Sequence, residues 1–488
     1  MDDLPYEIWY LIVQYLPSDE VENLFSVSRA LFNIALDLHY REVHLPGRAR
    51  GPLMSKHLKK INIYHLRNPL VVSRPREVHI LDLFDPWPGV QAKKSVLESA
   101  RKYLFKSKKP YASQTNALKQ VVEIIPFLTS VTTLHVEKGF EGFLQNPEVL
   151  NSGLFFQCWA AFGSQLKVLS LATPLEIFHR VTGQDLHLPC LEVLRMQIWD
   201  CFQTTEPNSI ISTQVIPFIQ RNQATICNLK LDIEDYTIDV SALLGPLESM
   251  CQLSSLDLKT SYTNCLKTNF IGLERLLRAR RHELHTLRIR THHYYFSQRF
   301  QTFAEFFQSP CWHIPLPKLK TLDIEPPLSE WKDLEYAYLV RFKSSLTTLR
   351  LSPNIRWQYP EVACLTNILT PFENLKYLEL LVFSMSPALL SLFATSIPQL
   401  ETLRLFYKYI FANLMFPSEA SERFVEELQK YNNLSSWNLK ELDYCESLRT
   451  VVSDGKVEVA LVDKLSNVQW FCGLYRDEFK SRFIKLVG

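Results

Sequence analysis

A repeating arrangement of apolar positions runs through most of the chain, in the form apolar-x-x-apolar-x-apolar. It starts at Val131, Leu166, Leu191, Ile226, Leu253, Leu284, Leu319, Leu346, Leu375, Leu400 and Leu439. Successive starts lie 25 to 39 residues apart and average about 31. The alternation at the end of each unit is typical of a short strand, and helical stretches such as 270–281 and 421–431 lie between units. A strand and a helix of this size cannot bury their apolar faces alone, so the pattern predicts a stacked solenoid.

These units resemble irregular leucine-rich repeats. The expected fold class is α/β, with parallel strands on the concave side of the solenoid and helices on the convex side. Val43-His44-Leu45 and Val78-His79-Ile80 resemble two earlier strands of the same array. The competing fold is a doubly wound nucleotide-binding sheet, which is disfavoured because no Gly-x-Gly-x-x-Gly motif occurs and the chain has only 13 glycines.

The fifth position of each unit carries charges whose signs alternate. From the fourth unit onward it is occupied by Lys230, Asp257, Arg288, Asp323, Arg350, Glu379, Arg404 and Asp443. Because neighbouring strands are about 4.8 Å apart, each charge would lie between two opposite ones. We therefore predict a self-compensating charge ladder in which each exposed pair contributes about 0–1 kcal/mol.

The first 45 residues read as short helices rather than as a repeat. Pro5 suits a first helical position, and an apolar stripe at Ile8, Leu11, Ile12, Tyr15 and Leu16 follows it. Asp19 and Glu22 resemble a capping box for a second helix, with Leu24 and Val27-Ser28 on its stripe. A third helical segment contains Leu31, Ile34, Ala35 and Leu38. Three short helices bury too little surface to be stable alone, so they need a partner or the domain behind them.

This segment is similar to the F-box motif along nearly its whole length, with Phe32 where many F-boxes carry Trp. Together with the repeats, the resemblance is to fungal-type F-box proteins that serve as substrate receptors of Skp-cullin-F-box ubiquitin ligases. It implies docking on a Skp-type adaptor, and through it on cullin and RING subunits, by apolar anchors in a groove. The anchors expected from the motif are Leu4, Pro5, Ile8, Ile12, Leu16, Leu24 and Val27. Some of these must face the interior of the F-box instead, and the alternative is a plain helical cap for the solenoid.

Aromatic loops beyond the strands are candidates for binding a protein client. Rigid scaffolds often carry recognition on loops, and aromatic residues with Arg are frequent at binding hot spots. The candidates are Arg290, His293, Tyr294, Tyr295, Trp357, Tyr359, Tyr407 and Tyr409. The alternative is that these rings only pack the rim between units.

Composition limits the remaining classes of function. The 53 Lys and Arg balance 51 Asp and Glu, so no overall charge favours nucleic acid or membrane. Ten scattered cysteines fit neither a zinc ribbon nor a disulfide framework, which together with the acidic start Met1-Asp2-Asp3 favours a cytoplasmic or nuclear location. The uncharged stretch 380–400 contains two prolines and is expected to form a buried strand, a turn and a short helix rather than a membrane span.

No motif for catalysis is present, so we expect a non-enzyme without cofactor or metal. His282, His285, His292 and His293 form a dense histidine cluster, but surface histidines are the simpler interpretation. The basic run 93–109 is interpreted as a solvated helix or loop, with a nuclear-import signal as the alternative.

The predicted organisation is an F-box at 1–45, a connecting region with possible early repeats at 46–130, the solenoid at 131–447 and a C-terminal cap at 448–488. The predicted function is the substrate-recognition subunit of a ubiquitin ligase that binds an unidentified protein client. The alternative is a repeat scaffold without a ubiquitination client.

Overall fold

The structure is a computed structural model of the chain. It describes residues 4–16, 20–21, 24, 27–45, 66, 68–80, 119, 121–136, 153–199, 206–234, 238–260, 270–291, 309–325, 338–351, 357–410, 417–446 and 455–487. The chain divides into two compact units, Met1–Asp235 and Tyr236–Gly488, which are described separately below.

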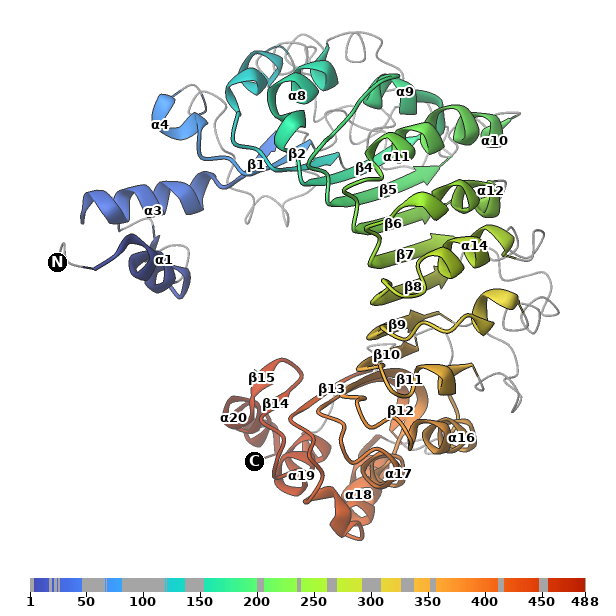
Figure 1. Cartoon of the computed structure of the whole chain (residues 1–488). Helices are drawn as coiled ribbons and strands as arrows, with labels where there is room; N and C mark the ends of the chain where they lie inside the picture. Colours follow the sequence, from blue (N-terminus) through green and yellow to red (C-terminus); the bar gives the residue numbers. More distant parts are fainter. Residues whose placement is uncertain are drawn as a thin grey trace, which may run out of the picture. The chain divides into compact units, whose positions relative to one another are not determined.

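The described residues of the first unit form two N-terminal helices followed by a parallel sheet in chain order (Figure 1). Its strands are β1 (Glu42–Leu45), β2 (Glu77–Ile80), β3 (Thr133–Val136), β4 (Val168–Pro174), β5 (Val193–Trp199) and β6 (Asn228–Ile233). Its described α-helices are α1 (Tyr6–Gln14), α3 (Arg29–Tyr40), α4 (Pro69–Val72), α8 (Leu154–Phe162), α9 (Phe178–Thr182), α10 (Pro207–Ile210) and α11 (Ile216–Asn222). The two early strands expected from the Val-His pattern are therefore β1 and β2.

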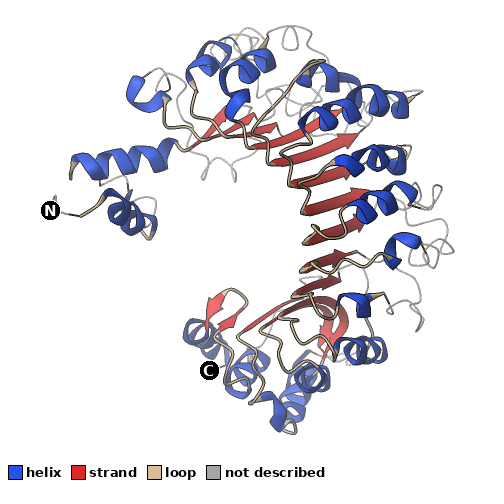
Figure 2. Cartoon of the chain, in the orientation of Figure 1, coloured by secondary structure: helices blue, strands red, loops and turns tan. Residues whose placement is uncertain are grey.

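The second unit continues the same plan. Its parallel strands are β7 (Ser255–Thr260), β8 (Thr286–Thr291), β9 (Thr321–Ile324), β10 (Thr348–Leu351), β11 (Tyr377–Met385), β12 (Thr402–Ile410), β13 (Glu441–Glu446) and β14 (Trp470–Phe471). Its described α-helices are α12 (Val240–Leu244), α14 (Ile271–Ala279), α16 (Tyr359–Leu369), α17 (Pro387–Ser396), α18 (Pro417–Leu428), α19 (Lys456–Lys464) and α20 (Arg476–Val487). Before β9 and β10 the structure describes short 3-10 turns, η10 (Pro310–His313) and η11 (Leu339–Phe342). In each unit the helices cover one face of the sheet (Figure 2).

Columns of aliphatic side chains form the core between sheet and helices. All eleven residues that start the predicted repeats are fully buried, and the fourth and sixth positions continue the column, as Leu322 and Ile324 do in β9. Each strand lies in register with the next, so the columns run from strand to strand. Each unit is thus a solenoid of strand–helix repeats of the leucine-rich kind, as the apolar pattern predicts.

The uncharged stretch 380–400 also folds as expected. It forms the second half of β11, a turn at Ser386 and helix α17, whose N-terminus is capped by the Ser386 hydroxyl accepting from the Leu389 amide at 3.2 Å. Among the described residues, no helix is long and apolar enough to cross a membrane.

The predicted charge ladder is confirmed within the second unit. The fifth-position residues pair in register from Asp257 to Asp443. Their charged atoms approach to 3.9 Å between Arg288 and Asp257, 3.6 Å between Arg350 and Glu379, and 2.9 Å between Arg404 and Asp443. Burial raises the pKa of Asp323, although the positive charges of Arg290, Arg350 and Arg288 oppose that rise. The ladder keeps these carboxylates and guanidinium groups compatible with a half-buried surface.

The C-terminal segment covers the edge of the last long strand. β14 pairs in parallel with β13, and β15 (Leu474–Tyr475) pairs antiparallel with β14. Arg476 then donates from its guanidinium to the carbonyl oxygens of Val462, Leu465 and Val468, at 2.7 Å for Leu465 and 2.9 Å for Val468. Val462 and Leu465 lie at the end of α19 and Val468 lies in the segment before β14, so one side chain fixes the hairpin to the preceding helix.

Close helix packing in the second unit predicts one sensitive position. A Cβ on Gly272 in α14 would meet the backbone of Ser241 in α12 well inside contact distance. Gly272→Ala must therefore separate the two helices, and we expect it to lower the free energy of unfolding by about 1–3 kcal/mol, measured by urea denaturation. Gly245→Ala is the matched control, because its Cβ would lie 3.9 Å from the nearest atom. Equal stability of the two variants would contradict this account of the packing.

Candidate functional site

Helix α1 is apolar on the face that points away from the rest of the first unit. Leu4, Ile8, Leu11, Ile12 and Tyr15 recur at helical spacing and are 41–87% exposed. We call these five residues, together with Val27 at 56% exposure, the α1 surface. Large apolar side chains rarely gather on exposed surface without a partner.

The opposite face of α1 is also apolar and packs on α3. Val13, Leu31 and Ile34 form a buried cluster, with Trp9, Tyr10, Val21, Leu24 and Leu38 packed around it. A helix that is apolar all round is normally buried on both sides. Only one side of α1 is covered by the described part of the chain.

The structure thus sorts the residues predicted as adaptor anchors. Leu4, Pro5, Ile8, Ile12 and Val27 are exposed, Leu16 is half-buried, and Leu24 belongs to the interior cluster. Ser28, which was assigned to the second helix, instead caps α3, since its hydroxyl accepts from the Leu31 amide at 3.2 Å. The capping box at Asp19 and Glu22 lies outside the described residues.

Asp37 connects the two helices to the start of the solenoid. One carboxylate oxygen accepts from the Tyr6 hydroxyl of α1 at 2.8 Å, and the other pairs with Arg74 at 2.7 Å. Arg74 precedes β2 and also donates to the Asn33 side chain at 3.0 Å. Burial and the bond to Asp37 raise the pKa of Tyr6 to about 12. The α1 surface is therefore held in a fixed orientation on the first repeats.

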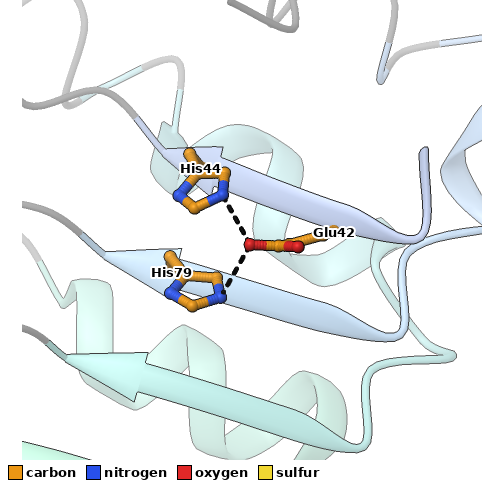
Figure 3. A group of neighbouring side chains, drawn as sticks. All are labelled: Glu42, His44 and His79. Atoms are coloured by element: carbon orange, nitrogen blue, oxygen red, sulfur yellow. Dashed lines mark hydrogen bonds and ion pairs between the residues drawn. The ribbon is translucent and has the colours of Figure 1, made fainter. Parts of the chain in front are cut away.

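Three histidines stack across the first strands, on the sheet face that carries the fifth repeat positions. His44, His79 and His135 are aligned by the strand register, and successive ring centroids are 4.4 Å apart. Glu42 Oε1 lies 2.7 Å from His44 Nε2 and 3.3 Å from His79 Nε2 (Figure 3). Glu77 Oε1 lies 2.9 Å from His79 Nε2 and 3.0 Å from His135 Nε2. Among the described residues, two groups could hold a metal ion: Glu42, His44 and His79, and Glu77, His79 and His135.

Sequence reasoning missed this histidine column, although a signal for it was present. The triplets Val43-His44-Leu45, Val78-His79-Ile80 and Leu134-His135-Val136 place one His at the same point of three strands. Glu occupies the position two residues earlier in the first two of them. The sequence pointed instead to a histidine cluster around residues 282–293. Its described members, His282 and His285, belong to no group that could hold a metal ion. His292, His293 and the basic run 93–109 lie outside the described residues.

An open cavity of about 350 Å³ lies next to the histidine column. Its polar lining includes His135, Ser170, Arg195, Gln197, Lys230 and Asp232 from β3 to β6. Gln197 donates to Glu234 at 2.5 Å, so part of this lining is already paired. The lining carries both signs of charge and is a polar contact surface.

The residues predicted to bind a client separate into four groups. Trp357 and Tyr407 are buried, at 1% and 8% exposure, so they pack the repeats rather than face a partner. Arg290 donates to both Asp257 carboxylate oxygens, at 2.6 and 2.7 Å. Tyr359 and Tyr409 are exposed, at 48% and 42%. His293, Tyr294 and Tyr295 lie outside the described residues.

Comparison with known proteins does not assign a family. No protein-family model matches the sequence, and no curated protein matches it. Forty-three chains of solved structures match the fold. One is titled a crystal structure of a TLR13-ssRNA13 complex, with 13% identity and a TM-score of 0.27. The match covers 88% of this chain but only 57% of that one, and a likeness this distant carries no argument about function.

The Asp37 connection predicts a local effect on α1. Asp37→Ala leaves Tyr6 and Arg74 without their shared acceptor, so we expect a loss of about 1–2 kcal/mol in local stability. Hydrogen exchange of the α1 amides should then be about 5- to 30-fold faster. The control is Asp463→Ala, which removes an exposed pair with Lys480 and should leave α1 exchange unchanged. Unchanged protection of α1 in Asp37→Ala would show that the helix is held by its apolar contacts alone.

Proposed function

We propose that the chain is the substrate-recognition subunit of a Skp-cullin-F-box ubiquitin ligase. In this proposal α1 and its neighbours bind a Skp-type adaptor, and the repeats hold a protein client near the conjugating enzyme. The chain itself contributes no chemical step and acts by proximity.

The α1 surface is the observation that carries the proposal. Its members Leu4, Ile8, Ile12 and Val27 are residues of the F-box motif, and they are apolar yet exposed. The motif residue Leu24 is instead partly buried against Val13, Leu31 and Ile34, so it packs within the helices and leaves the α1 surface for the adaptor. Helix-in-groove recognition uses apolar residues one helical turn apart, as Ile8 and Ile12 are.

The Asp37 connection supports the same function. A receptor must present its client at a defined distance from the adaptor, and Asp37 joins α1, α3 and Arg74 through direct side-chain bonds. A helical cap that only covered the first repeat would need one apolar face, whereas α1 has two.

The client surface is proposed around Tyr409 at the end of β12. Tyr409 packs edge-on against Phe383 with ring centroids 5.3 Å apart, and the Lys408 ammonium lies 4.6 Å from its ring centre. An exposed tyrosine on a half-buried phenylalanine, with an adjacent cation, has the composition of a binding hot spot. Tyr359 at the N-terminus of α16 is a second exposed aromatic residue.

Charging the α1 surface should abolish adaptor binding. Ile8→Glu and Ile12→Glu place a carboxylate in the proposed apolar groove, so we expect at least about a 30-fold weaker Kd for a co-expressed Skp-type adaptor. Both residues are more than 40% exposed, so the variants should melt like the wild type. Calorimetric titration with purified adaptor measures the change.

Gln14→Glu is the matched control, because it adds the same charge to an exposed position of α1 outside the apolar stripe. We expect it to bind the adaptor as the wild type does. A folded wild type that does not bind would overturn the proposal and leave a helical cap on a repeat scaffold. If the adaptor binds but the purified complex contains no cullin, the adaptor-binding role would stand and the ligase role would be excluded.

Client binding gives a separate prediction. Cells that lack the chain should accumulate its client proteins. Re-expressed Tyr409→Ala should fail to reverse that accumulation, as measured by quantitative proteomics, although its melting temperature equals that of the wild type. Trp357→Ala should instead lower the free energy of unfolding by about 3–5 kcal/mol, because it empties a buried ring site. Normal client turnover in Tyr409→Ala would exclude this residue from the client surface.

A further inference from the structure

The histidine column is unusual because parallel register forces three imidazoles into contact. The rings of His44 and His79 stack at an interplanar angle of 21°, and those of His79 and His135 at 15°. Protonating all three would place like charges 4.4 Å apart. Within the described part of the chain the ion-pair partners of Glu42 and Glu77 are histidines rather than Lys or Arg. Two carboxylates and three imidazole rings form a set of donors suited to a divalent cation.

The Glu42, His44 and His79 group has the geometry that such an ion requires. Tetrahedral zinc with ligands at about 2.0–2.1 Å separates its donor atoms by about 3.4 Å. Glu42 Oε1 lies 3.3 Å from His79 Nε2 and 2.7 Å from His44 Nε2, so a small opening of one contact accommodates the ion. Both imidazole nitrogens point toward the same carboxylate oxygen (Figure 3). The Glu42 side chain is 51% exposed, which gives water access to the remaining coordination position.

The neighbouring group, Glu77, His79 and His135, is less favourable for a cation. Arg195 lines the same open cavity as His135 and places a positive charge near this group. The positive field of Arg195 opposes a metal ion at the same place. Both groups share the Nε2 of His79, whose single lone pair serves one ion at a time.

We propose that Glu42, His44 and His79 bind one divalent transition-metal ion of the zinc class, with water completing its coordination. The ion would join β1 to β2 and thereby fasten the first strand of the sheet, next to α3, to the repeat that follows. Glu77 Oε1 lies 2.9 Å from the same Nε2 of His79, so this contact is lost when the ion binds, and Glu77 then adds negative charge near the ion.

The second nitrogen of His44 sets the expected affinity. Its Nδ1 is buried and has no hydrogen-bond partner among the described residues. Metal binding at Nε2 moves the ring proton to this Nδ1, and a missing outer partner typically weakens metal binding by about 10- to 100-fold. We therefore expect a Kd in the micromolar range rather than that of a closed structural zinc site.

The experiment is a titration of the purified, chelator-treated full chain with Co²⁺ and Zn²⁺ in the presence of a phosphine reductant. Co²⁺ reports its ligands optically, because imidazole and carboxylate give weak d–d bands whereas a cysteine ligand adds an intense thiolate charge-transfer band. We expect one Co²⁺ per chain without the thiolate band, and a micromolar Zn²⁺ Kd by calorimetry. Zn²⁺ should also raise the melting temperature of the wild type.

Substitutions assign the ligands. His44→Gln, His79→Gln and Glu42→Gln should each weaken Zn²⁺ binding by at least about 10-fold and remove the rise in melting temperature. Glu42→Gln tests the site without altering a buried residue. His135→Gln should bind within about threefold of the wild type, and the His282→Gln/His285→Gln double variant controls for other histidines.

Four results would overturn the proposal. The first is a wild type that binds Zn²⁺ no more tightly than about 1 mM. The second is a wild-type Zn²⁺ affinity in both of the folded single variants Glu42→Gln and His44→Gln. The third is loss of binding in His135→Gln but not in His44→Gln, which would place the ion in the other group. A thiolate band that accounts for all the bound Co²⁺ would likewise contradict the assignment.

Discussion

Parallel pairing in strict register is the constraint on which the rest of this molecule depends. It places the same position of successive repeats about 4.8 Å apart, so each column of side chains must be compatible with itself. On the buried face of the sheet, this requirement is met by aliphatic residues such as Leu322 and Leu349. On the other face it is met by alternating charges in the second unit and by histidines with glutamates in the first. The same pairing rule thus produces the core, the ladder and the proposed metal site.

The sequence was sufficient for features that depend on register and insufficient for those that depend on tertiary packing. The apolar pattern identified the buried column and the charge ladder, because a repeat position translates directly into a place on the strand. It could not separate exposed from packing residues in α1, since a helix with two apolar faces has no informative periodicity. Nor could it show that Trp357 and Tyr407 are buried, because their burial is set by contacts with other segments. The histidine column was hidden because 54 residues separate the strand residues Val78 and Thr133, well beyond the usual repeat interval.

The N-terminal helices differ from the repeats in how they reach stability. Each repeat buries its apolar side against its neighbours, whereas α1 covers one apolar face with α3 and leaves the other in solvent. The polar contacts of Asp37 fix which face is left open, because they join both Tyr6 of α1 and Arg74 to α3. In the proposed receptor, orientation is therefore set by a few hydrogen bonds and affinity by the apolar surface.

The reversal of strand direction at β15 has a consequence for how the protein behaves at high concentration. A parallel sheet that ends on a long strand offers a row of unpaired amides on which another molecule can continue the ladder. Here β15 is two residues long and leads directly into α20, and Arg476 holds the turn against α19. So short an edge provides too few hydrogen bonds to fix the register of an incoming strand. End-to-end polymerisation into fibres is thereby blocked at this edge by geometry, without the lysines or prolines that often protect sheet edges.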